Sequence, residues 1–293
     1  MLAAIQFPDI SPEIFAFDLF GFHIALRWYA MAYIIGIALG WQILKYALNR
    51  PGLWPADTAP MSAAKLEDLL TYIVVGVIAG GRLGYVVFYK PVYYLANPIE
   101  IPQIWTGGMS FHGGFIGVIA AVYLFSLRHK VPLGQLSDGI ALSAPVAILL
   151  VRLANFINAE LWGRQTDLPW GVLFPTEAAQ TCATAAGLCA RHPSQLYEAA
   201  LEGLLLGIIL WILAIRRGAL KISWRLTGVF FTGYGLARFM VEFLRQPDAQ
   251  FVTQGNPLGL AYHIGGYGLT MGQTLSLPMV LIGMVLLLRS RRA

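Results

Sequence analysis

Residues 138–160 read DGIALSAPVAILLVRLANFINAE, an apolar run whose last turns carry Arg152, Asn155 and Asn158. A helix that crosses a membrane needs roughly 20 apolar residues. A charged side chain near the bilayer centre costs on the order of 2.5–3.5 kcal/mol on insertion scales, so residues such as Arg152 indicate function. The stretch therefore predicts a spanning helix whose polar end belongs to a site near one membrane face.

The whole chain shares this apolar character. Of its 293 residues, 57% are hydrophobic and 12% are charged, whereas soluble domains average about 25% charged residues. The composition predicts an all-α polytopic membrane protein. The net charge of +5 comes from short basic blocks between apolar runs, which is typical of membrane orientation signals. We expect membrane lipids as neighbours and no nucleic-acid partner.

Seven segments are candidate transmembrane helices, and together they define the expected topology. They lie at about residues 24–44, 66–88, 110–128, 138–158, 196–215, 224–244 and 271–289. No internal repeat is visible, so residues 1–293 are predicted to form a single membrane domain. Basic residues cluster in alternate loops and after the last span, which places the C-terminus in the cytoplasm and the N-terminus outside.

Two loops on the expected outer side are long. Residues 89–109 are rich in Pro, Tyr and Trp and are predicted to form an arm. Residues 159–195 are predicted to form a small head, and they contain Cys182 and Cys189. The pairing of these cysteines is left open, because an oxidising compartment would permit it but the spacing does not require it.

Polar residues gather at one depth of the expected membrane. The orientation of each span places six of them toward the outer face: Tyr29, Arg82, His112, Arg152, Arg238 and Glu242. Side chains that merely reached for the interface would be expected at both ends of the helices. The distribution favours one functional site, although a polar seam between helices is the alternative.

The spacing of these residues predicts an anion site. Arg152, Asn155 and Asn158 are three apart and share roughly one helical face. A guanidinium flanked by carboxamides suits a phosphate and its ester oxygens. Arg238 and Glu242 are four apart, a spacing equally consistent with a structural ion pair. The GxSxG motif of other lipid enzymes does not occur. No carboxylate cluster offers an obvious magnesium site, so we predict no metal, and we expect no cofactor.

Five motifs in a fixed order resemble a known family, the bacterial prolipoprotein diacylglyceryl transferases. They are Gly80-Gly-Arg-Leu-Gly-Tyr85, Gly107-Gly-Met-Ser-Phe-His112-Gly-Gly114, Arg152-Leu-Ala-Asn155-Phe-Ile-Asn158-Ala-Glu160 with Trp162-Gly163, Arg191-His-Pro-Ser-Gln-Leu-Tyr-Glu198, and Arg238-Phe-Met-Val-Glu242-Phe-Leu-Arg-Gln-Pro-Asp248. The resemblance covers about residues 20–290. Residues 176–190 match nothing recognisable in the family.

The resemblance implies a seven-helix enzyme with a periplasmic head in the bacterial inner membrane. It implies phosphatidylglycerol as donor and, as acceptor, the lipobox cysteine of a preprolipoprotein that still carries its signal peptide. The products are a diacylglyceryl thioether and glycerol 1-phosphate, in the first step of lipoprotein maturation. The family's important positions fall on Tyr29, His112, Arg152, Asn155, Glu160, Gly163, Tyr234, Arg238 and Glu242.

The reaction predicts a role for each group. A thiol displaces a phosphate ester at a glycerol carbon, so the site must favour thiolate and hold the departing phosphate. We expect Arg152 and Arg238 to clamp the phosphate and Asn155 to orient the head group, with Glu242 fixing Arg238 and Glu160 holding the loop after the fourth span. His112 is the candidate base, and an arginine-stabilised thiolate is the alternative.

Two other functions fit a membrane protein with this site. A transporter or lipid-binding protein would need no chemistry, but transporters often show internal repeats and broken helices in matching halves. A different lipid transferase could use the same anion site. A diacylglyceryl adduct on a lipobox peptide would support only the predicted transferase.

Overall fold

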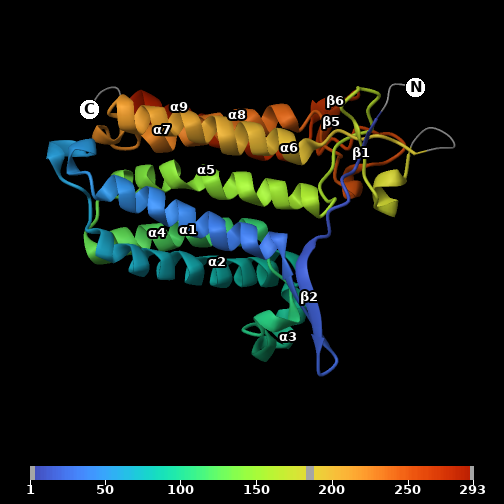
Figure 1. Ribbon diagram of the computed structural model, residues 1–293, viewed down its shortest axis with the longest axis horizontal. Helices are drawn as coiled ribbons and strands as arrows, with labels where there is room; N and C mark the ends of the chain where they lie inside the picture. Colours follow the sequence, from blue (N-terminus) through green and yellow to red (C-terminus); the bar gives the residue numbers. More distant parts are fainter. Residues whose placement is uncertain (1–3, 183–187, 291–293) are drawn as a thin grey trace. The chain divides into compact units, whose positions relative to one another are not determined.

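The computed structural model describes residues 4–182 and 188–290, and most of these are helical (Figure 1). The longer helices are α1 (Trp28–Leu48), α2 (Leu66–Tyr89), α4 (Phe111–His129), α5 (Leu133–Ile157), α7 (Leu206–Arg216), α8 (Arg225–Val241) and α9 (Met271–Ser290). Two shorter helices are α3 (Pro91–Ala96) and α6 (Ser194–Glu198). A π-helical segment, Ala199–Leu205, joins α6 to α7.

Five helical stretches are long and apolar enough to cross a membrane, which confirms the coarse prediction of a helical, multi-pass chain. They are Trp28–Leu48, Ala63–Tyr89, Leu133–Ile157, Ser194–Arg216 and Met271–Ser290. The two other expected spans, about 110–128 and 224–244, correspond to α4 and α8. Both are helical, but neither is among these five in the described residues. That all seven helices cross stays a prediction.

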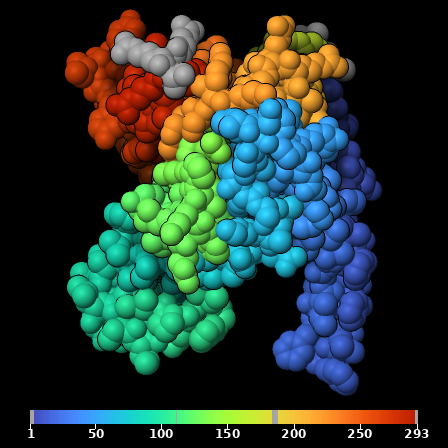
Figure 2. All heavy atoms as spheres, turned by 90° about the vertical axis from the view of Figure 1, so that its left-hand side faces the viewer, coloured from blue at the N-terminus to red at the C-terminus, as the bar shows by residue number. Residues whose placement is uncertain are grey.

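Short strands correct the all-helical prediction. Strands β2 (Glu13–Leu19) and β3 (Phe22–Arg27) form an antiparallel hairpin, so the first long helix begins at Trp28 and not near residue 24. Its two-residue turn, Phe20-Gly21, has positive φ at both positions, as hairpin turns that match strand twist require. The hairpin forms a narrow finger (Figure 2, blue) whose tip residues Phe20 and Phe22 are 91% and 74% exposed.

Two further pairs of strands are shorter still. Strand β1 (Ile5–Gln6) runs parallel to β4 (Val172–Leu173), which attaches the start of the described chain to the loop 159–195. Strands β5 (Tyr262–Ile264) and β6 (Tyr267–Leu269) form a hairpin directly before α9. Each sheet has only two strands, so the helices carry the architecture.

The outward faces of the long helices are apolar. Ile34, Val75 and Leu281 are examples from three helices, and each side chain is more than half exposed. Helices that are hydrophobic on every face belong in a membrane or a protein core. These exposed apolar faces fit contact with lipid.

The chain divides into two compact units. One comprises residues 1–44, 140–219 and 224–293, and the other comprises residues 45–139 and 220–223. We call them the large and the small unit. The single membrane domain over residues 1–293 stays a prediction.

Glycines allow the two main helices of the small unit to pack closely. A Cβ added to Gly80 would lie 2.8 Å from Gly117 Cα, and one added to Gly84 would lie 2.7 Å from Gly113 Cα. Helices α2 and α4 therefore meet backbone to backbone along Gly76, Gly80 and Gly84. This four-residue spacing, the Gly76–Gly84 repeat, is typical of close helix packing in membranes. Gly113 beside His112 belongs to the same contact.

Substitution of Gly80 should test this packing. Gly80→Leu is expected to lower the free energy of unfolding by about 1–3 kcal/mol or more, because the added side chain collides with backbone that cannot move aside. The thermal midpoint in detergent measures the effect. Gly255→Ala is the control, since nothing lies within 4 Å of a Cβ at that position. Equal midpoints for the two variants would contradict the close approach.

Helices also pack closely in the large unit. A Cβ at Gly36 would lie 2.9 Å from Ala147 Cα, so α1 and α5 approach closely. Helices α7, α8 and α9 lie side by side (Figure 1), with Gly235 of α8 against Val280 of α9. The ends of α5, α6 and α8 thereby bring their polar residues together.

Candidate active site

Two of the predicted arginines meet at a buried carboxylate. Arg152 lies near the end of α5 and Arg238 near the end of α8, and each side chain is 18% exposed. Arg152 Nη1 lies 3.1 Å from Glu198 Oε2, and Arg238 Nη1 pairs with Glu198 Oε1. The structure thus brings together the two groups expected to clamp phosphate.

Glu198 is the centre of a larger ion-pair cluster. Its side chain is fully buried, and its Oε1 also lies 2.8 Å from Arg245 Nη1. Glu202 Oε2 lies 3.6 Å from Arg152 Nη2. Glu242 Oε2 lies 2.9 Å from Arg238 Nη2 and 3.5 Å from Arg245 Nε. The predicted Arg238–Glu242 ion pair is therefore present, inside a cluster of three arginines and three glutamates.

The cluster is formally neutral, with three guanidinium groups balanced by three carboxylates. Breaking one buried pair leaves an uncompensated charge, which is strongly destabilising. The balance explains how so many arginines can lie at the ends of apolar helices. It also fixes the guanidinium groups in place before any substrate arrives.

Sequence reasoning missed two carboxylates of the cluster, Glu198 and Glu202. Glu198 ends α6 and Glu202 lies in the π-helical segment that follows, and π-bulges occur frequently at functional sites. Both residues lie within the expected span 196–215. Their four-residue spacing in an apolar run was the available signal, because such carboxylates require cationic partners.

The chain turns sharply where α5 ends. Ala159 and Leu161 have φ of 51° and 56°, a left-handed conformation that non-glycine residues adopt at some cost. Gln195 Nε2 donates to the Glu160 carbonyl and Ser194 Oγ donates to the Leu161 carbonyl at 2.8 Å. The start of α6 therefore holds this turn.

Asn155 and Glu160 bind one another across that turn. Asn155 Nδ2 donates to Glu160 Oε1 at 2.7 Å, and Asn158 Nδ2 lies 3.5 Å from the same oxygen. Asn155 is 2% exposed. Its buried Oδ1 has no hydrogen-bond partner among the described residues, so one acceptor remains available beside Arg152.

Gly163 lies where two backbone segments come together. Its N–H donates to the His192 carbonyl at 2.8 Å, and it forms an isolated β-bridge with Arg245. A Cβ at this position would lie 2.7 Å from His192 Cβ and overlap the Leu244 carbonyl. Only glycine fits here, so Gly163 joins the head loop to the arginine cluster through its backbone.

Of the two tyrosines that were predicted, Tyr234 contacts the cluster directly and Tyr29 is linked to it through Tyr33. The Tyr234 hydroxyl interacts with the Arg152 guanidinium. Tyr29 Oη lies 3.4 Å from Tyr33 Oη, and Tyr33 interacts electrostatically with Arg152 and Glu160. Eight of the predicted site residues belong to the large unit: Tyr29, Arg152, Asn155, Glu160, Gly163, Tyr234, Arg238 and Glu242.

His112 and Arg82 belong to the small unit. His112 is exposed in the first turn of α4, after the N-cap Ser110. Arg82 is 3% exposed, and its Nε and Nη2 donate to the Ile101 and Glu100 carbonyls at 2.7 and 2.8 Å. Arg82 thus anchors the predicted arm at residues 89–109, which gives it a structural role. The convergence of all six polar residues stays a prediction.

Within the described residues, no group of three or more His, Cys, Asp or Glu side chains is arranged to hold a metal ion. The three glutamates of the cluster instead face arginines. The expectation of a metal-independent reaction stays a prediction.

Comparison with known proteins identifies the family. The family model for prolipoprotein diacylglyceryl transferase matches residues 15–289. The chain belongs to this family. The resemblance inferred from the five motifs is therefore confirmed, and with it the prediction of a transferase.

Curated relatives agree over nearly their whole length. A protein of Ruegeria pomeroyi is 62% identical over 99% of this chain and 99% of its own length. One from Cereibacter sphaeroides is 59% identical over 99% of both chains. One from Rhizobium meliloti is 44% identical over 100% of this chain and 96% of its own. Each is named phosphatidylglycerol–prolipoprotein diacylglyceryl transferase.

Proposed function

We propose that this chain transfers the diacylglyceryl group of phosphatidylglycerol to the lipobox cysteine of a preprolipoprotein. The observation that carries the proposal is the partly exposed pair Arg152 and Arg238, held by the buried Glu198 in a chain of this family. The new bond joins the cysteine sulfur to the terminal glycerol carbon of the diacylglyceryl group. The bond from that carbon to the phosphate oxygen breaks, and glycerol 1-phosphate leaves.

In the proposed topology seven helices cross the bacterial inner membrane, with the N-terminus in the periplasm and the C-terminus in the cytoplasm. Basic residues in alternate loops support this orientation. The arm at residues 89–109 and the head at residues 159–195 then lie in the periplasm. The arginine cluster lies at the ends of α5, α6 and α8 that adjoin this head, where an acceptor outside the membrane can reach it.

In the proposed mechanism Arg152 and Arg238 stabilise charge on the departing phosphate. One negative charge resides on the phosphodiester, and a second develops as the phosphate leaves. Preorganised donors stabilise such developing charge without reorganising during the reaction. A guanidinium has five N–H donors, so each arginine keeps some beyond those that pair with the glutamates. The partial exposure of both arginines supports their role as phosphate donors.

The residues around the pair orient the lipid head group in this mechanism. The unpaired Asn155 Oδ1 is a buried acceptor that a glycerol hydroxyl of the head group can satisfy. Tyr234 contacts Arg152, and Tyr29 contacts Tyr33, which in turn interacts with Arg152. Glu242 fixes Arg238, Glu160 fixes Asn155, and Gly163 lets the head loop approach the cluster.

His112 is the proposed general base, and substitution tests that role. His112→Gln is expected to lower kcat by about 10²–10⁴-fold near neutral pH if the imidazole removes the thiol proton. The pH dependence of kcat measures it. A near-normal rate across pH would leave proton removal to an arginine-stabilised thiolate, without a general base.

A peptide-modification assay tests the whole proposal. Purified full-length protein is incubated with phosphatidylglycerol and a lipobox peptide, and the product is analysed by mass spectrometry. We expect a diacylglyceryl adduct on the cysteine and release of glycerol 1-phosphate. A peptide with serine in place of that cysteine is the control. Lipid bound without adduct would indicate a binding protein, and adduct only with another lipid would indicate a different transferase.

A further inference from the structure

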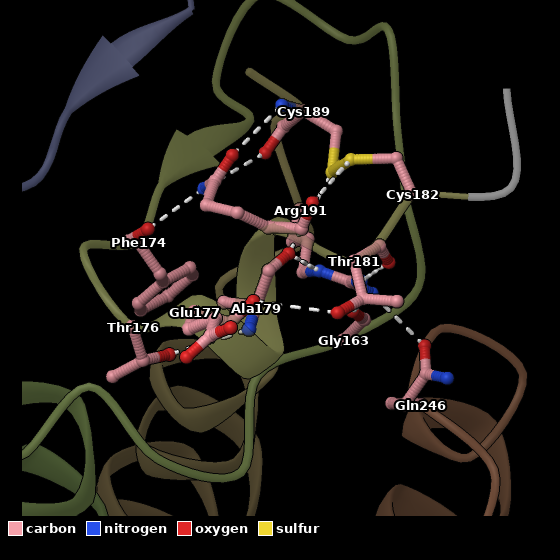
Figure 3. Close-up of a disulfide and its surroundings, with 11 residues drawn as sticks. Gly163, Phe174, Thr176, Glu177, Ala179, Thr181, Cys182, Cys189, Arg191 and Gln246 are labelled. Atoms are coloured by element: carbon pink, nitrogen blue, oxygen red, sulfur yellow. Dashed lines mark hydrogen bonds between the residues drawn. A yellow bond between two sulfur atoms is a disulfide. The ribbon is translucent and has the colours of Figure 1, made fainter. Parts of the chain in front are cut away.

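A disulfide lies in the head loop. Cys182 and Cys189, the two cysteines of the chain, are bonded to each other (Figure 3). Their pairing, which the sequence left open, is therefore settled in this structure. The bond lies within the segment 176–190 that resembles nothing in the family motifs, and it ends two residues before Arg191.

Arg191 is a buried cation whose guanidinium is bound by neutral oxygen atoms and not by a carboxylate. It is 4% exposed, and no ion pair involves it within the part of the chain that the structure describes. Its guanidinium lies 4.1 Å from the Trp162 ring centroid. Burial lowers the pKa of Arg191, as expected for a cation that depends on neutral acceptors.

Four oxygens satisfy this guanidinium, and they come from two places (Figure 3). Two belong to the segment that precedes the disulfide: the Ala179 carbonyl, which accepts from Nε, and the Thr181 carbonyl, 2.7 Å from Nη2. The others are the Gly163 carbonyl, 3.4 Å from Nη1, and Gln246 Oε1, 3.0 Å from the same nitrogen. Arg191 therefore connects the disulfide-bonded segment to Gly163 and Gln246.

Gly163 and Gln246 lie next to the arginine cluster. Gly163 forms its β-bridge with Arg245, and Gln246 is the next residue along the chain. Arg245 in turn pairs with Glu198 and Glu242. A continuous series of contacts thus runs from the disulfide through Arg191 to the cluster that contains Arg238.

We propose that Arg191 is a positioning residue for this cluster and that the Cys182–Cys189 disulfide holds it in place, so that reducing the bond lowers transferase activity. The inference rests on the proposed function. In the reduction, a dithiol cleaves the S–S bond and becomes a cyclic disulfide. The two cysteines gain two electrons and two protons and become thiols.

The physical reason is the cost of leaving a buried cation without acceptors. Reduction frees the segment that carries the Ala179 and Thr181 carbonyls, and losing buried hydrogen bonds to a charged group is expensive. Gln180 gives a second connection, because its Oε1 accepts from the Cys189 N–H at 3.0 Å and its Nε2 donates to the Phe174 carbonyl at 2.7 Å. We therefore expect a reduced rate and not complete loss.

The experiment compares the two redox states of the full-length protein. One sample is treated with dithiothreitol and its thiols are capped with N-ethylmaleimide, while the other is only exposed to the capping reagent. Both are desalted and assayed with freshly reduced lipobox peptide and phosphatidylglycerol. We expect roughly a tenfold lower kcat after reduction. The Cys182→Ser/Cys189→Ser variant should show the same fall and no response to dithiothreitol.

Arg191→Met provides the second measurement. It should lower kcat to a similar extent, and combining it with the two serine substitutions should add little, because both changes act through one guanidinium. Glu177→Gln, at an exposed residue of the same segment, is the matched control. Each rate is measured well below the thermal midpoint of the variant, so that loss of stability alone does not lower the rate.

Two results would overturn the inference. One is an unchanged kcat in the reduced protein together with a lower thermal midpoint, because the disulfide would then serve stability alone. The other is fully additive losses for Arg191→Met and the serine pair. An untreated wild-type protein that forms no adduct would instead contradict the proposed function, so the two failures are distinguishable.

Discussion

Replacing Arg152 or Arg238 with alanine is expected to abolish formation of the diacylglyceryl thioether. Removing one preorganised donor to a developing oxyanion costs about 10²–10³-fold in kcat. The substitution also leaves Glu198 short of a counterion, which adds to the loss. The mass-spectrometric adduct assay with phosphatidylglycerol and lipobox peptide measures the rate. Activity of Arg152→Ala within a few-fold of wild type would contradict the proposed clamp.

Arg245 offers a matched control for these substitutions. It contacts Glu198 and Glu242, as Arg238 does, and its side chain is similarly exposed, at 15% against 18%. Arg245→Ala therefore removes the same charge from the same cluster without removing a proposed phosphate ligand. We expect a smaller loss of kcat than for Arg238→Ala. Equal losses would mean that the arginines act only by balancing charge.

Replacing Glu198 is expected to damage both stability and activity. Its fully buried carboxylate contacts three guanidinium groups, so Glu198→Gln removes the common counterion of Arg152, Arg238 and Arg245. Breaking a buried ion pair by removing one partner costs about 3–5 kcal/mol. We expect a fall of that size in the free energy of unfolding and about a hundredfold lower kcat.

Thermal denaturation and the adduct assay measure the two effects of Glu198→Gln. Glu202→Gln should cost less, because Glu202 makes only the 3.6 Å ion pair with Arg152 among the described salt bridges. Glu177→Gln, at an exposed position, should change neither quantity. The account of a charge-balanced cluster fails if Glu198→Gln keeps both wild-type stability and wild-type turnover.

The sequence allowed the arginines and Glu242 to be predicted as site residues, but not the counterions Glu198 and Glu202. Arg152 and Arg238 stood out because guanidinium groups interrupt apolar runs, and the Arg238–Glu242 pair followed from helical spacing. Glu198 and Glu202 interrupt the expected span 196–215 in the same way. Arginines within apolar helices require carboxylates nearby, so carboxylates that interrupt another apolar run are the natural candidates for their counterions.

Other features depended on contacts that periodicity does not reveal. The hairpin at residues 13–27 does alternate, with large apolar side chains on one face and Asp18 and His23 on the other. Its second strand runs directly into the apolar residues of α1, so residues 24–27 look like part of the first span in the sequence. Arg82 and Arg191 donate to backbone carbonyls of the connecting segments, and such a carbonyl leaves no mark in the sequence. Helix packing was predictable, because the Gly76–Gly84 repeat has only one common use in a spanning helix.

Lipid binding by native mass spectrometry tests the central claim most directly, because it separates phosphate recognition from chemistry. The purified protein is offered phosphatidylglycerol and a diacylglycerol with the same acyl chains, which lacks the phosphate. Wild type and Arg245→Gln are predicted to retain phosphatidylglycerol in preference to diacylglycerol, and Arg152→Gln/Arg238→Gln to lose that preference while remaining folded. A folded double variant that still selects phosphatidylglycerol as strongly as wild type would contradict the account.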